Sequence, residues 1–467
     1  MRFSRALTAF FCLVLSVFLS VVVGACSGQP EETSRPKNVI LLIADGCGPA
    51  SFTLARTYRR DVLGQAGGLA VDPHLVGTVQ THATDSRVTD SAAGATAYAC
   101  GVKTYNGAIA VDTLRRPVAT VLEAAEARGM ATGLVATSTL THATPAAFSA
   151  HVPNRGMAAE IAAQQITKGI EVLFGGGRAD FLPESAGGRR TDGRNLLEEA
   201  RAAGYHVALT RAAFDSVTAP PVLGLFAGSH LDYELDRDPA EQPSLAEMTR
   251  KALDLLRNDP DGFFLMVEGS RIDHAGHAND AAAHLHDILA FDEAVAVALD
   301  FARQEGETLV VVTSDHETGG LTLGRNLDGR GVYAWYPGVL APVRHSNDAL
   351  ARMLREGADP ETVLREAGLD PATLDPADRR ALLEAAEDGD ARTFLSHYND
   401  LIARRAVIAW TTGGHTGVDV NLYAFGPGHT RFFGNHDNAA VGRQIAGLLG
   451  LDLPALTEKL QAQSGAE

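Results

Sequence analysis

The sequence predicts a three-layer α/β/α sandwich, in which helices cover both faces of a largely parallel central sheet, with one helical insert. Short runs rich in Val, Ile and Leu alternate with Ala-rich helical stretches along most of the chain, and this repetition is typical of parallel sheets. Several of the short runs are apolar throughout, as strands are when both faces of a sheet are covered. The 45% hydrophobic and 21% charged residues are ordinary for a globular protein and exclude a disordered, collagen-like or coiled-coil chain.

The expected strands and helices alternate along much of the chain. Expected strands are 38–44, 131–136, 171–174, 205–209, 222–226, 263–267, 309–313 and 418–424. Expected helices are 118–128, 157–168, 245–257, 281–303 and 438–449. In sheets of this kind the active site lies beyond the carboxyl ends of the strands, so the residues that follow the strands are the first candidates for chemistry.

One region departs from this alternation. From about 347 to 402 the sequence is charged, Leu-rich and helical, with little strand character, and Asp-Pro pairs beginning at 359, 370 and 375 interrupt it. We expect a small helical insert or lid within a main catalytic domain that spans 37–467.

The first residues are typical of an export signal. Arg2 and Arg5 precede an uncharged apolar run that ends in small residues directly before Cys26. This layout resembles a bacterial lipobox, which predicts a lipoprotein signal peptide over 1–25, a lipid on Cys26 and a flexible tether over 26–36. An uncleaved membrane anchor or an ordinary cleaved signal are alternatives, because the run is just long enough to span a bilayer. All three export the protein, and the lipid would hold it on the periplasmic or extracellular face of the cell envelope.

Charge and cysteine content narrow the function classes. The 40 Lys and Arg against 57 Asp and Glu give a net charge of −17, which argues against a nucleic-acid partner. A field of this sign repels anionic substrates, so any anion chemistry must depend on local positive charge.

Cys47 and Cys100 alone would remain as free cysteines of the mature chain, too few for a disulfide-built fold. We expect two buried thiols, with a Cys47–Cys100 bridge as the alternative.

Carboxylates and imidazoles gather at the predicted strand ends. Three strands are followed, and the last one is preceded, by such residues: Asp45; Glu268 with Asp273 and His277; Asp315 with His316; and His415. One Asp–His pair is uninformative in a chain with 16 His, but four such sites in register favour a metal centre over coincidence. Mixed imidazole and carboxylate ligands without thiolate suit Zn²⁺, and an all-oxygen neighbouring site suits Mg²⁺.

The segment that begins at Asp90-Ser91 opens an Ala-rich helix. Two interpretations fit it. Asp-Ser is a common N-cap. Beside a metal cluster, however, a serine at a helix N-terminus is also a candidate nucleophile, because a cation can stabilise its alkoxide without an adjacent base.

Together these residues resemble the alkaline phosphatase family. The matching blocks, in family order, are Asp45-Gly46, DSAAGATAYACGVK (90–103), THATPAAF (141–148), HVPNR (151–155), VEGSRIDHAGHAND (267–280), SDHE (314–317) and GGHTG (413–417). They span nearly the whole mature chain, and their wording is closer to the animal-type branch than to the enteric-bacterial one.

The resemblance implies hydrolysis of small-molecule phosphate monoesters through a phosphoserine intermediate, with two Zn²⁺ and one Mg²⁺ as cofactors. Ser91 matches the serine that is transiently phosphorylated. Arg155 matches the guanidinium that holds two phosphate oxygens in a bidentate fork, and Asp90 would orient it.

The resemblance also assigns metal ligands. Asp273, His277 and His415 match the ligands of the zinc that activates water; Asp45, Asp315 and His316 match those of the zinc that faces Ser91; Asp45, Glu268 and Thr144, with His142 beside them, match the magnesium site.

Some positions depart from the family pattern. His142 and His274 stand where enteric-bacterial members have Asp and Lys, so we expect weaker magnesium retention, with zinc as a competitor. For His274 the alternatives are a hydrogen-bonding role behind the ligands and direct phosphate contact. Ala227 and Gln242 stand where mammalian members have acidic calcium ligands. The insert occupies the place of the family's crown domain but differs from it in composition, which leaves a homodimer as a candidate assembly of unspecified geometry.

Rival functions remain at this point. A phosphodiesterase or phosphonate hydrolase of the same superfamily would share the two-zinc ligands but would usually lack the magnesium set and the arginine clamp. Glu268, Thr144 and Arg155 together favour the monoesterase. A non-catalytic phosphate- or metal-binding lipoprotein would explain the ligands but not a serine placed among them.

Overall fold

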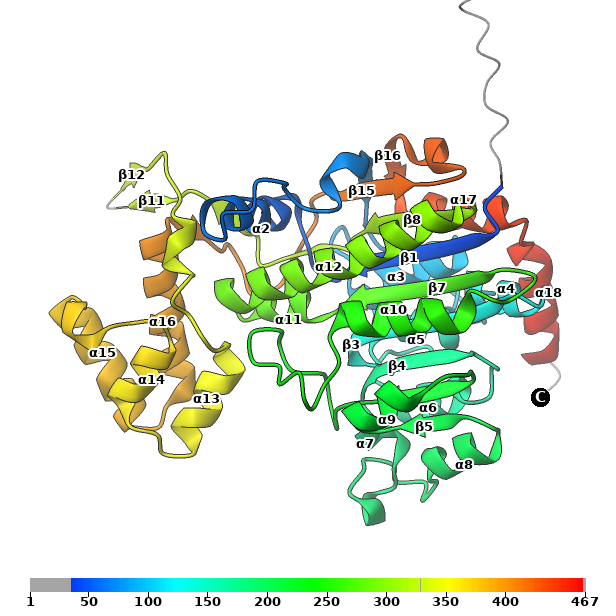
Figure 1. The fold of residues 1–467 in the computed structure, drawn as a ribbon, viewed down its shortest axis with the longest axis horizontal. Helices are drawn as coiled ribbons and strands as arrows, with labels where there is room; N and C mark the ends of the chain where they lie inside the picture. The colour runs from blue at the N-terminus through cyan, green and yellow to red at the C-terminus, as the bar shows by residue number, and fades with distance from the viewer. Residues whose placement is uncertain (1–34, 328, 465–467) are drawn as a thin grey trace, which may run out of the picture. The chain divides into compact units, whose positions relative to one another are not determined.

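The computed structural model describes residues 35–327 and 329–464; the predicted signal peptide and most of the tether lie outside the described residues. Its centre is a 10-stranded sheet (Figure 1). From one edge to the other the strands are β16 (Gly434–Asp437), β2 (Leu75–Gln80), β15 (Val420–Phe425), β8 (Thr308–Thr313), β1 (Asn38–Ala44), β7 (Phe263–Gly269), β3 (Ala131–Thr139), β4 (Val172–Gly176), β6 (Val222–Leu225) and β5 (His206–Ala208). Neighbouring strands are parallel, except that β15 runs antiparallel to both β2 and β8.

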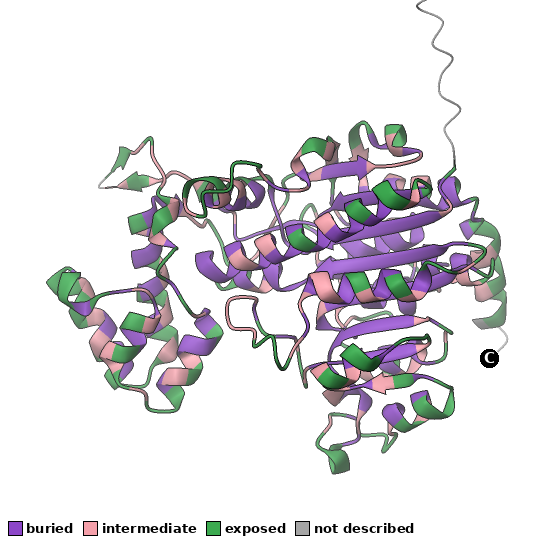
Figure 2. Ribbon diagram, viewed as in Figure 1, coloured by how far each residue is buried: buried purple, intermediate pink, exposed green. Residues whose placement is uncertain are grey.

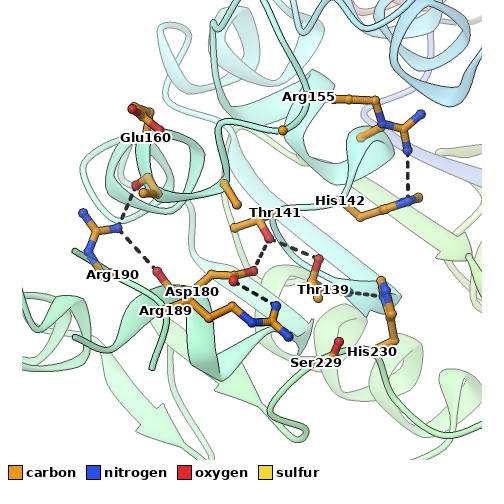
Figure 3. A pocket seen from close by; sticks show the side chains of 14 residues that line it. Thr139, Thr141, His142, Arg155, Glu160, Asp180, Arg189, Arg190, Ser229 and His230 are labelled. Atoms are coloured by element: carbon orange, nitrogen blue, oxygen red, sulfur yellow. Dashed lines mark hydrogen bonds and ion pairs between the residues drawn. The ribbon is translucent and has the colours of Figure 1, made fainter. Parts of the chain in front are cut away.

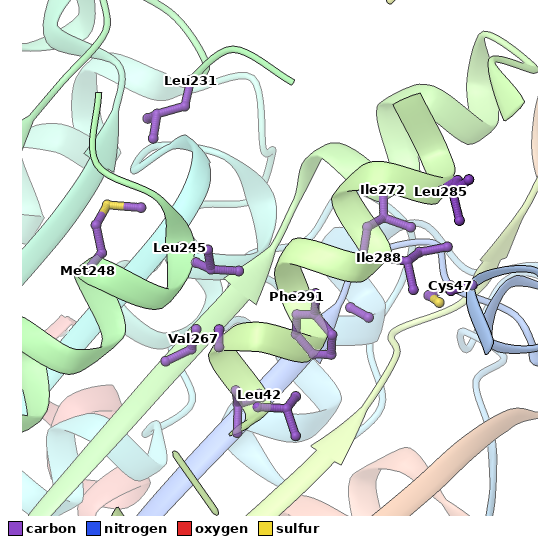
Figure 4. Close-up of a cluster of buried hydrophobic side chains, with 14 of the residues drawn as sticks. Leu42, Cys47, Leu231, Leu245, Met248, Val267, Ile272, Leu285, Ile288 and Phe291 are labelled. Atoms are coloured by element: carbon purple, nitrogen blue, oxygen red, sulfur yellow. The ribbon is translucent and has the colours of Figure 1, made fainter. Parts of the chain in front are cut away.

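Helices cover both faces of the sheet, and every residue of β1 and β7 is buried between them (Figure 2). Ile40 and Leu42 pack into a core on one face, whereas Val39 and Leu41 pack into a separate core on the other, because successive side chains of a strand point to opposite faces. Figure 4 shows the first core, where Leu42 and Val267 of the sheet meet the helix that carries Ile288 and Phe291. The predicted three-layer α/β fold is therefore confirmed.

The helices of the two layers come from widely separated parts of the sequence. One layer contains α2 (Pro49–Asp61), α10 (Leu245–Leu256) and α12 (Ala281–Glu305); the other contains α3 (Ser91–Cys100), α4 (Val121–Glu126), α5 (Ala143–Ser149), α6 (Ala158–Gln165), α8 (Leu196–Ala202) and α17 (Asn438–Leu449). The five predicted helices correspond to α4, α6, α10, α12 and α17 and differ from them by a few residues at their ends. The prediction did not include α2, α8 or the C-terminal helix α18 (Leu453–Ser464).

The edge strand β16 and its neighbour β2 were also not predicted. β16 has the sequence GNHD, which contains no apolar residue, and these residue types are unfavourable in strands. It forms through backbone pairing with β2, from Gly434 opposite Gly77 to Asp437 opposite Gln80. The close pairing requires a glycine at position 77, since a Cβ there would lie 1.8 Å from the Gly434 carbonyl oxygen.

The segment 347–406 forms a separate group of helices, coloured yellow to orange beyond the end of the sheet in Figure 1. They are α13 (Asn347–Arg355), α14 (Pro360–Glu366), α15 (Pro376–Glu387) and α16 (Ala391–Ala406). Asp359 and Asp375 cap α14 and α15 through their side chains, and each is followed by a proline at the first helical position. The Asp-Pro pairs that interrupt the sequence pattern are therefore mostly helix starts.

This helical group is tied to the segment that follows α11 (Arg271–His277). The Asn347 amide donates a 2.7 Å hydrogen bond to Asp280, and the Asn399 side chain donates a 2.9 Å bond to the Ala278 carbonyl. The Arg271 guanidinium pairs with Asp348 at 2.9 Å. Three attachments within ten residues of chain hold the insert against α11.

Within the described ranges, no helix is both long enough and apolar enough to cross a membrane. Cys47 and Cys100 are free, buried thiols in the two separate cores on opposite faces of the sheet. The alternative of a Cys47–Cys100 bridge is therefore wrong, because the sheet lies between the two sulfurs.

We predict that Asp280 makes the stability of the protein depend on pH. Burial, with smaller contributions from Asp236 and Asp348, raises the pKa of Asp280 to about 6. The folded state therefore holds a proton that the unfolded state releases near pH 4, so the free energy of unfolding decreases as the pH rises from about 4 to 6, by up to about 3 kcal/mol.

Asp280→Asn removes this titration. We expect the difference in the free energy of unfolding, wild type minus variant, to decrease between pH 4 and 7 in urea titrations with EDTA present. The variant also loses the carboxylate oxygen that accepts the Asn347 backbone amide. This loss lowers its free energy of unfolding by a similar amount at every pH, so the pH dependence of the difference is unchanged. Asp254→Asn, at a mostly exposed side chain, is the matched control. A pH-independent difference for Asp280→Asn would contradict the prediction.

Candidate active site

The predicted site residues lie at one edge of the sheet, at the carboxyl ends of four adjacent strands in the order β8, β1, β7 and β3. Asp45 directly follows β1, and Asp315 follows β8 after one residue. Glu268 is the last residue but one of β7, and His142 follows the end of β3 by three residues. Parallel strands thus bring residues that are far apart in sequence to one place.

Their ligand atoms form three overlapping groups, within each of which the atoms lie no more than 4.8 Å apart. The groups are Asp273 with His316 and His415; Asp45 with Asp315 and His316; and Asp45 with His142 and Glu268. Asp45 is shared by two groups, and so is His316. His277 belongs beside the first group, since its Nε2 lies 3.4 Å from Asp273 and 3.1 Å from the Nε2 of His415.

A short antiparallel ribbon brings His415 into the cluster. β14 (His415–Thr416) pairs with β9 (Glu317–Thr318), so that His415 lies opposite Thr318, two residues after His316. The His415 ring consequently stacks on the His316 ring, with centroids 3.6 Å apart.

Gly46 permits the tight turn after β1. Its φ is +71°, in the left-handed region that favours glycine. Its amide donates a 3.2 Å hydrogen bond to Asp315. A Cβ at this position would lie 2.8 Å from Asp273, so the close approach of the two carboxylate-bearing segments depends on the missing side chain.

Backbone carbonyls determine which nitrogen of two imidazoles carries the proton. The Nδ1 of His277 lies 2.7 Å from the Gly413 carbonyl, and the Nδ1 of His415 lies 2.8 Å from the Thr89 carbonyl. A carbonyl oxygen only accepts, so both Nδ1 atoms carry hydrogen and each Nε2 presents a lone pair. The two Nε2 atoms face each other at 3.1 Å, a geometry that needs a proton or a metal ion near both. In the absence of metal, hydrogen bonding to Asp273 raises the pKa of His277 to about 9.

Thr318 orients a third imidazole. Its hydroxyl donates a 2.6 Å hydrogen bond to Asp273 and lies 3.2 Å from the Nδ1 of His316, so it accepts the proton of that nitrogen. The Nε2 of His316 is then free to bind a cation. It lies 3.2 Å from Asp315, 3.5 Å from Asp45 and 3.2 Å from the Ser91 hydroxyl.

Several polar atoms of the site are buried without a hydrogen-bond partner. They are both carboxylate oxygens of Asp45, Oδ2 of Asp315, Oε1 of Glu268, Oγ1 of Thr144 and Nδ1 of His142. Unpaired buried polar atoms are costly, and they need an explanation in a native fold. Oxygen and imidazole donors that converge in this way fit divalent cations, with the Asp45, Glu268 and Thr144 oxygens suited to Mg²⁺ and the two groups that share His316 suited to Zn²⁺.

The pKa shifts of the buried carboxylates are those expected of a site that binds cations. Burial, followed by the charges of Asp315 and Asp273, raises the pKa of Asp45 well above its usual range. Burial raises the pKa of Asp315 to about 8 and that of Glu268 to about 7. Burial would also raise the pKa of Asp273, but its hydrogen bond to His277 and the nearby imidazoles hold it well below the ordinary value. Cations at the site would allow all four carboxylates to ionise at neutral pH.

Ser91 is the first residue of α3, and its side chain is fully buried in the cluster. Asp90 is the N-cap, because its carboxylate accepts the Ala93 amide at 3.0 Å. The capping role therefore belongs to Asp90, which leaves the Ser91 hydroxyl for its contact with His316.

Arg155 lies between Asp90 and His142. One terminal nitrogen donates to the other carboxylate oxygen of Asp90 at 3.0 Å, and the second donates to the Nε2 of His142 at 3.0 Å. Gly107 holds Asp90 in place through a 3.0 Å amide hydrogen bond. A guanidinium has five N–H groups, so Arg155 retains donors for an anion after these two contacts.

His142, His274 and His230 form a group of imidazoles beside Arg155. The His274 ring lies 5.4 Å from that of His142 and 4.5 Å from that of His230. Arg271 donates to the Nδ1 of His274 at 2.9 Å, so the proton of His274 is on Nε2. Burial, then the charges of Arg271 and His230, lowers the pKa of His274 to about 3, which keeps the ring neutral.

Next to this group is a pocket of about 430 Å³ (Figure 3). His142 and Arg155 line one side of it, and Asp180, Arg189 and His230 line the other. Asp180 accepts hydrogen bonds from Thr141 at 2.6 Å and from Arg189 at 3.3 Å. Asp180 and Arg189 of this pocket are thus already paired with each other.

Two site residues escaped the sequence reasoning. His230 follows β6 by a few residues, and the Thr139 amide donates to its Nδ1 at 3.1 Å; the strand-end argument applied to 222–226 could have found it. Thr318 stands two residues after His316, but a threonine in a short strand gives no signal that distinguishes it from ordinary β structure.

Comparisons with known proteins agree with one another. Residues 36–451 match the family model described as alkaline phosphatase. The repressible alkaline phosphatase of Saccharomyces cerevisiae is 41% identical over 96% of this chain and 87% of its own, and alkaline phosphatase 3 of Bacillus subtilis is 40% identical over 95% and 97%. The crystal structure of a cold-active alkaline phosphatase from a psychrophilic Shewanella superposes with a TM-score of 0.80 at 37% identity, covering 88% of this chain and 99% of that one.

We predict opposite effects of Asp45→Asn with and without metal. The substitution removes a buried charge that three other carboxylates repel, so in EDTA the variant should unfold at a higher urea concentration than the wild type. With zinc added, the variant should gain less stability and bind zinc roughly tenfold more weakly or worse, because it lacks a shared ligand. Urea unfolding and calorimetric zinc titration measure the two effects. Equal zinc affinity of both proteins would refute the assignment of Asp45.

Proposed function

Because the chain belongs to the alkaline phosphatase family, we propose that it hydrolyses phosphate monoesters through a phosphoserine intermediate formed on Ser91. One observation carries this proposal: the Ser91 hydroxyl lies 3.2 Å from His316, within a buried cluster of carboxylates and imidazoles. Its place at the first residue of α3 also favours negative charge on the oxygen, through the helix dipole and the free amides of the first turn.

Two Zn²⁺ and one Mg²⁺ would complete this site. The residues that would hold them are Asp273, His277 and His415; Asp45, Asp315 and His316; and Asp45, Glu268 and Thr144, with His142 adjacent. When bound, such cations supply charge stabilisation for the serine alkoxide and the leaving oxygen, and they lower the pKa of water.

The residues of the chain would act in two displacements. In the first, a bond forms between Ser91 Oγ and phosphorus while the bond from phosphorus to the leaving oxygen breaks, and the leaving alcohol takes up a proton. In the second, water attacks the phosphoserine, and Ser91 regains its hydroxyl. Arg155 would hold two phosphate oxygens in its fork throughout, with Asp90 fixing its orientation at 3.0 Å.

His274 would contribute a hydrogen-bond donor. Its proton is on Nε2, since Arg271 donates to Nδ1, and its ring is neutral and mostly buried beside His142. These contacts favour a direct hydrogen bond from His274 to the phosphate over a role behind the metal ligands.

We predict that Ser91→Ala removes turnover but not metal. The hydrolysis of p-nitrophenyl phosphate should decrease by roughly a thousandfold or more, because the nucleophile is lost while the ligands remain. Metal analysis of the purified variant is the control, and zinc content should equal that of the wild type. A variant that retains wild-type turnover would remove Ser91 as the nucleophile.

The same assays separate the monoesterase from its rivals. The wild type should hydrolyse p-nitrophenyl phosphate much faster than bis-p-nitrophenyl phosphate, lose this activity in EDTA and regain it with zinc. Faster hydrolysis of the diester would indicate a phosphodiesterase, and no hydrolysis with metal bound would indicate a binding protein.

For the location, we propose that 1–25 is a lipoprotein signal peptide, that Cys26 carries lipid, and that 26–36 tethers a catalytic domain beginning at 37, into which the helical insert 347–402 is placed. The support is the sequence pattern of Arg2, Arg5, the apolar run and the small residues before Cys26.

We predict that Cys26→Ser releases the protein from the membrane fraction. In cells labelled with a radioactive fatty acid, the wild type should carry label and partition into detergent, because acylation adds buried CH₂ groups. The variant should carry none. Labelled variant protein, or unlabelled wild type, would exclude lipid on Cys26.

A further inference from the structure

A second pocket, of about 720 Å³, begins at the cluster and extends along the helical insert. We call it the insert groove. It is lined by His277 and the segment that follows it, by Arg325 and Trp410, and by residues of α13 and α16. Its walls therefore combine the rim of the candidate active site with the insert.

The insert groove opens beside His277, one of the predicted metal ligands. An in-line displacement places the leaving oxygen opposite the attacking oxygen. The Ser91 hydroxyl contacts His316, which two of the groups share, whereas His277 lies beside Asp273 and His415 with 40% of its side chain exposed. The leaving group of a substrate held by Ser91 and Arg155 would thus pass His277 and enter the insert groove.

The two walls of the groove are held at a fixed separation. Asn399 and Asn347 both donate to the carbonyl of Ala278, the residue after His277. Asp348 of α13 pairs with Arg271 of α11 at 2.9 Å. The groove is consequently a formed feature of the fold, with one wall anchored to the same helix that supplies Asp273.

The groove lining contains two Arg and two Asp, and they differ in whether they are paired. Asp348 is neutralised by Arg271, and Asp400 pairs with Arg404 at 2.9 Å and with Arg325 at 3.6 Å. Arg392, in contrast, makes no ion pair within 4.0 Å in the described part of the chain, and its side chain is exposed. The Arg392 guanidinium interacts with the charge of Asp390 but forms no ion pair with it, so its donors are available to a ligand.

The apolar part of the groove surrounds an indole. Trp410 lies against Gly319, where a Cβ would be 2.4 Å from its ring, and its ring meets His284 edge-on at 5.4 Å. Small or aliphatic side chains, from Ala351, Ala403 and Leu395, complete the lining. Such a surface favours a flat ring, which can stack on the indole and bury apolar area.

We propose that the insert groove binds the leaving group of the substrate and selects aromatic phosphomonoesters whose ring carries a second negative charge. Trp410 and Leu395 receive the ring, and Arg392 binds the distal anion. This specificity rests on the proposed monoesterase function and assigns the role of substrate selection to the insert. The pocket in Figure 3 is the competing site, but its Arg189 is already paired with Asp180.

The kinetic test compares two substrates in matched variants. The ratio of kcat/KM for 4-carboxyphenyl phosphate to that for phenyl phosphate cancels changes in the shared phosphate site. Arg392→Gln should lower this ratio roughly three- to tenfold, the range for one charge-assisted contact in a partly exposed groove. Arg392→Lys should retain most of it. Arg189→Gln, in the competing pocket, should leave it unchanged. An unchanged ratio in Arg392→Gln, or a lower one in Arg189→Gln, would overturn the proposal.

A binding test does not require turnover. The chain has two tryptophans, Trp335 and Trp410, so Trp335→Phe makes Trp410 the single indole reporter. Saturable quenching of its fluorescence by 4-hydroxybenzoate is expected, with weaker affinity when Arg392→Gln is added. Quenching without any phosphatase turnover would support the groove and refute the proposed function. Turnover without saturable quenching would refute the groove alone.

Discussion

The burial of negative charge is the constraint on which the rest of the structure depends. Asp45, Glu268, Asp273 and Asp315 are all at most 3% exposed, and the nearest guanidinium, Arg155, is already paired with Asp90. Without cations, these carboxylates either repel one another or hold protons, as the raised pKa values of Asp45, Asp315 and Glu268 indicate. Only a rigid support can keep them together. The fully buried central strands, with a hydrophobic core on each face, provide it.

Much of the fold and site could be predicted because the central strands are apolar on both faces. Their limits are clear in the sequence, so the carboxylates that follow them, such as Asp45 and Asp315, can be assigned to one edge. β16 could not be predicted, since GNHD forms a strand only through its pairing with β2. The supporting contacts of Thr318 are tertiary and leave no periodic pattern. The alternative of a Cys47–Cys100 bridge was wrong because spacing in sequence does not reveal on which face of a sheet a residue lies.

Local backbone geometry connects the fold to the chemistry. The carbonyls of Gly413 and Thr89 and the hydroxyl of Thr318 each hold one imidazole nitrogen, and this fixes the lone pairs of His277, His415 and His316 toward the cluster. The β9–β14 pairing also positions a ligand, because it places His415 beside a segment about a hundred residues earlier in the chain. Affinity for the cations therefore depends on groups that never contact them.

The attachment of the insert has a consequence for how such enzymes diversify. The ligand-bearing strands belong to the sheet, whereas α13 and α16 are attached to α11 and to the short segment that follows it. If the insert groove binds the leaving group, exchange of the segment 347–406 between homologues would alter the leaving-group specificity. The ligands at the strand ends would stay in place. Chimeras that keep Asn347 and Asn399 as the joint would be natural starting points for engineering.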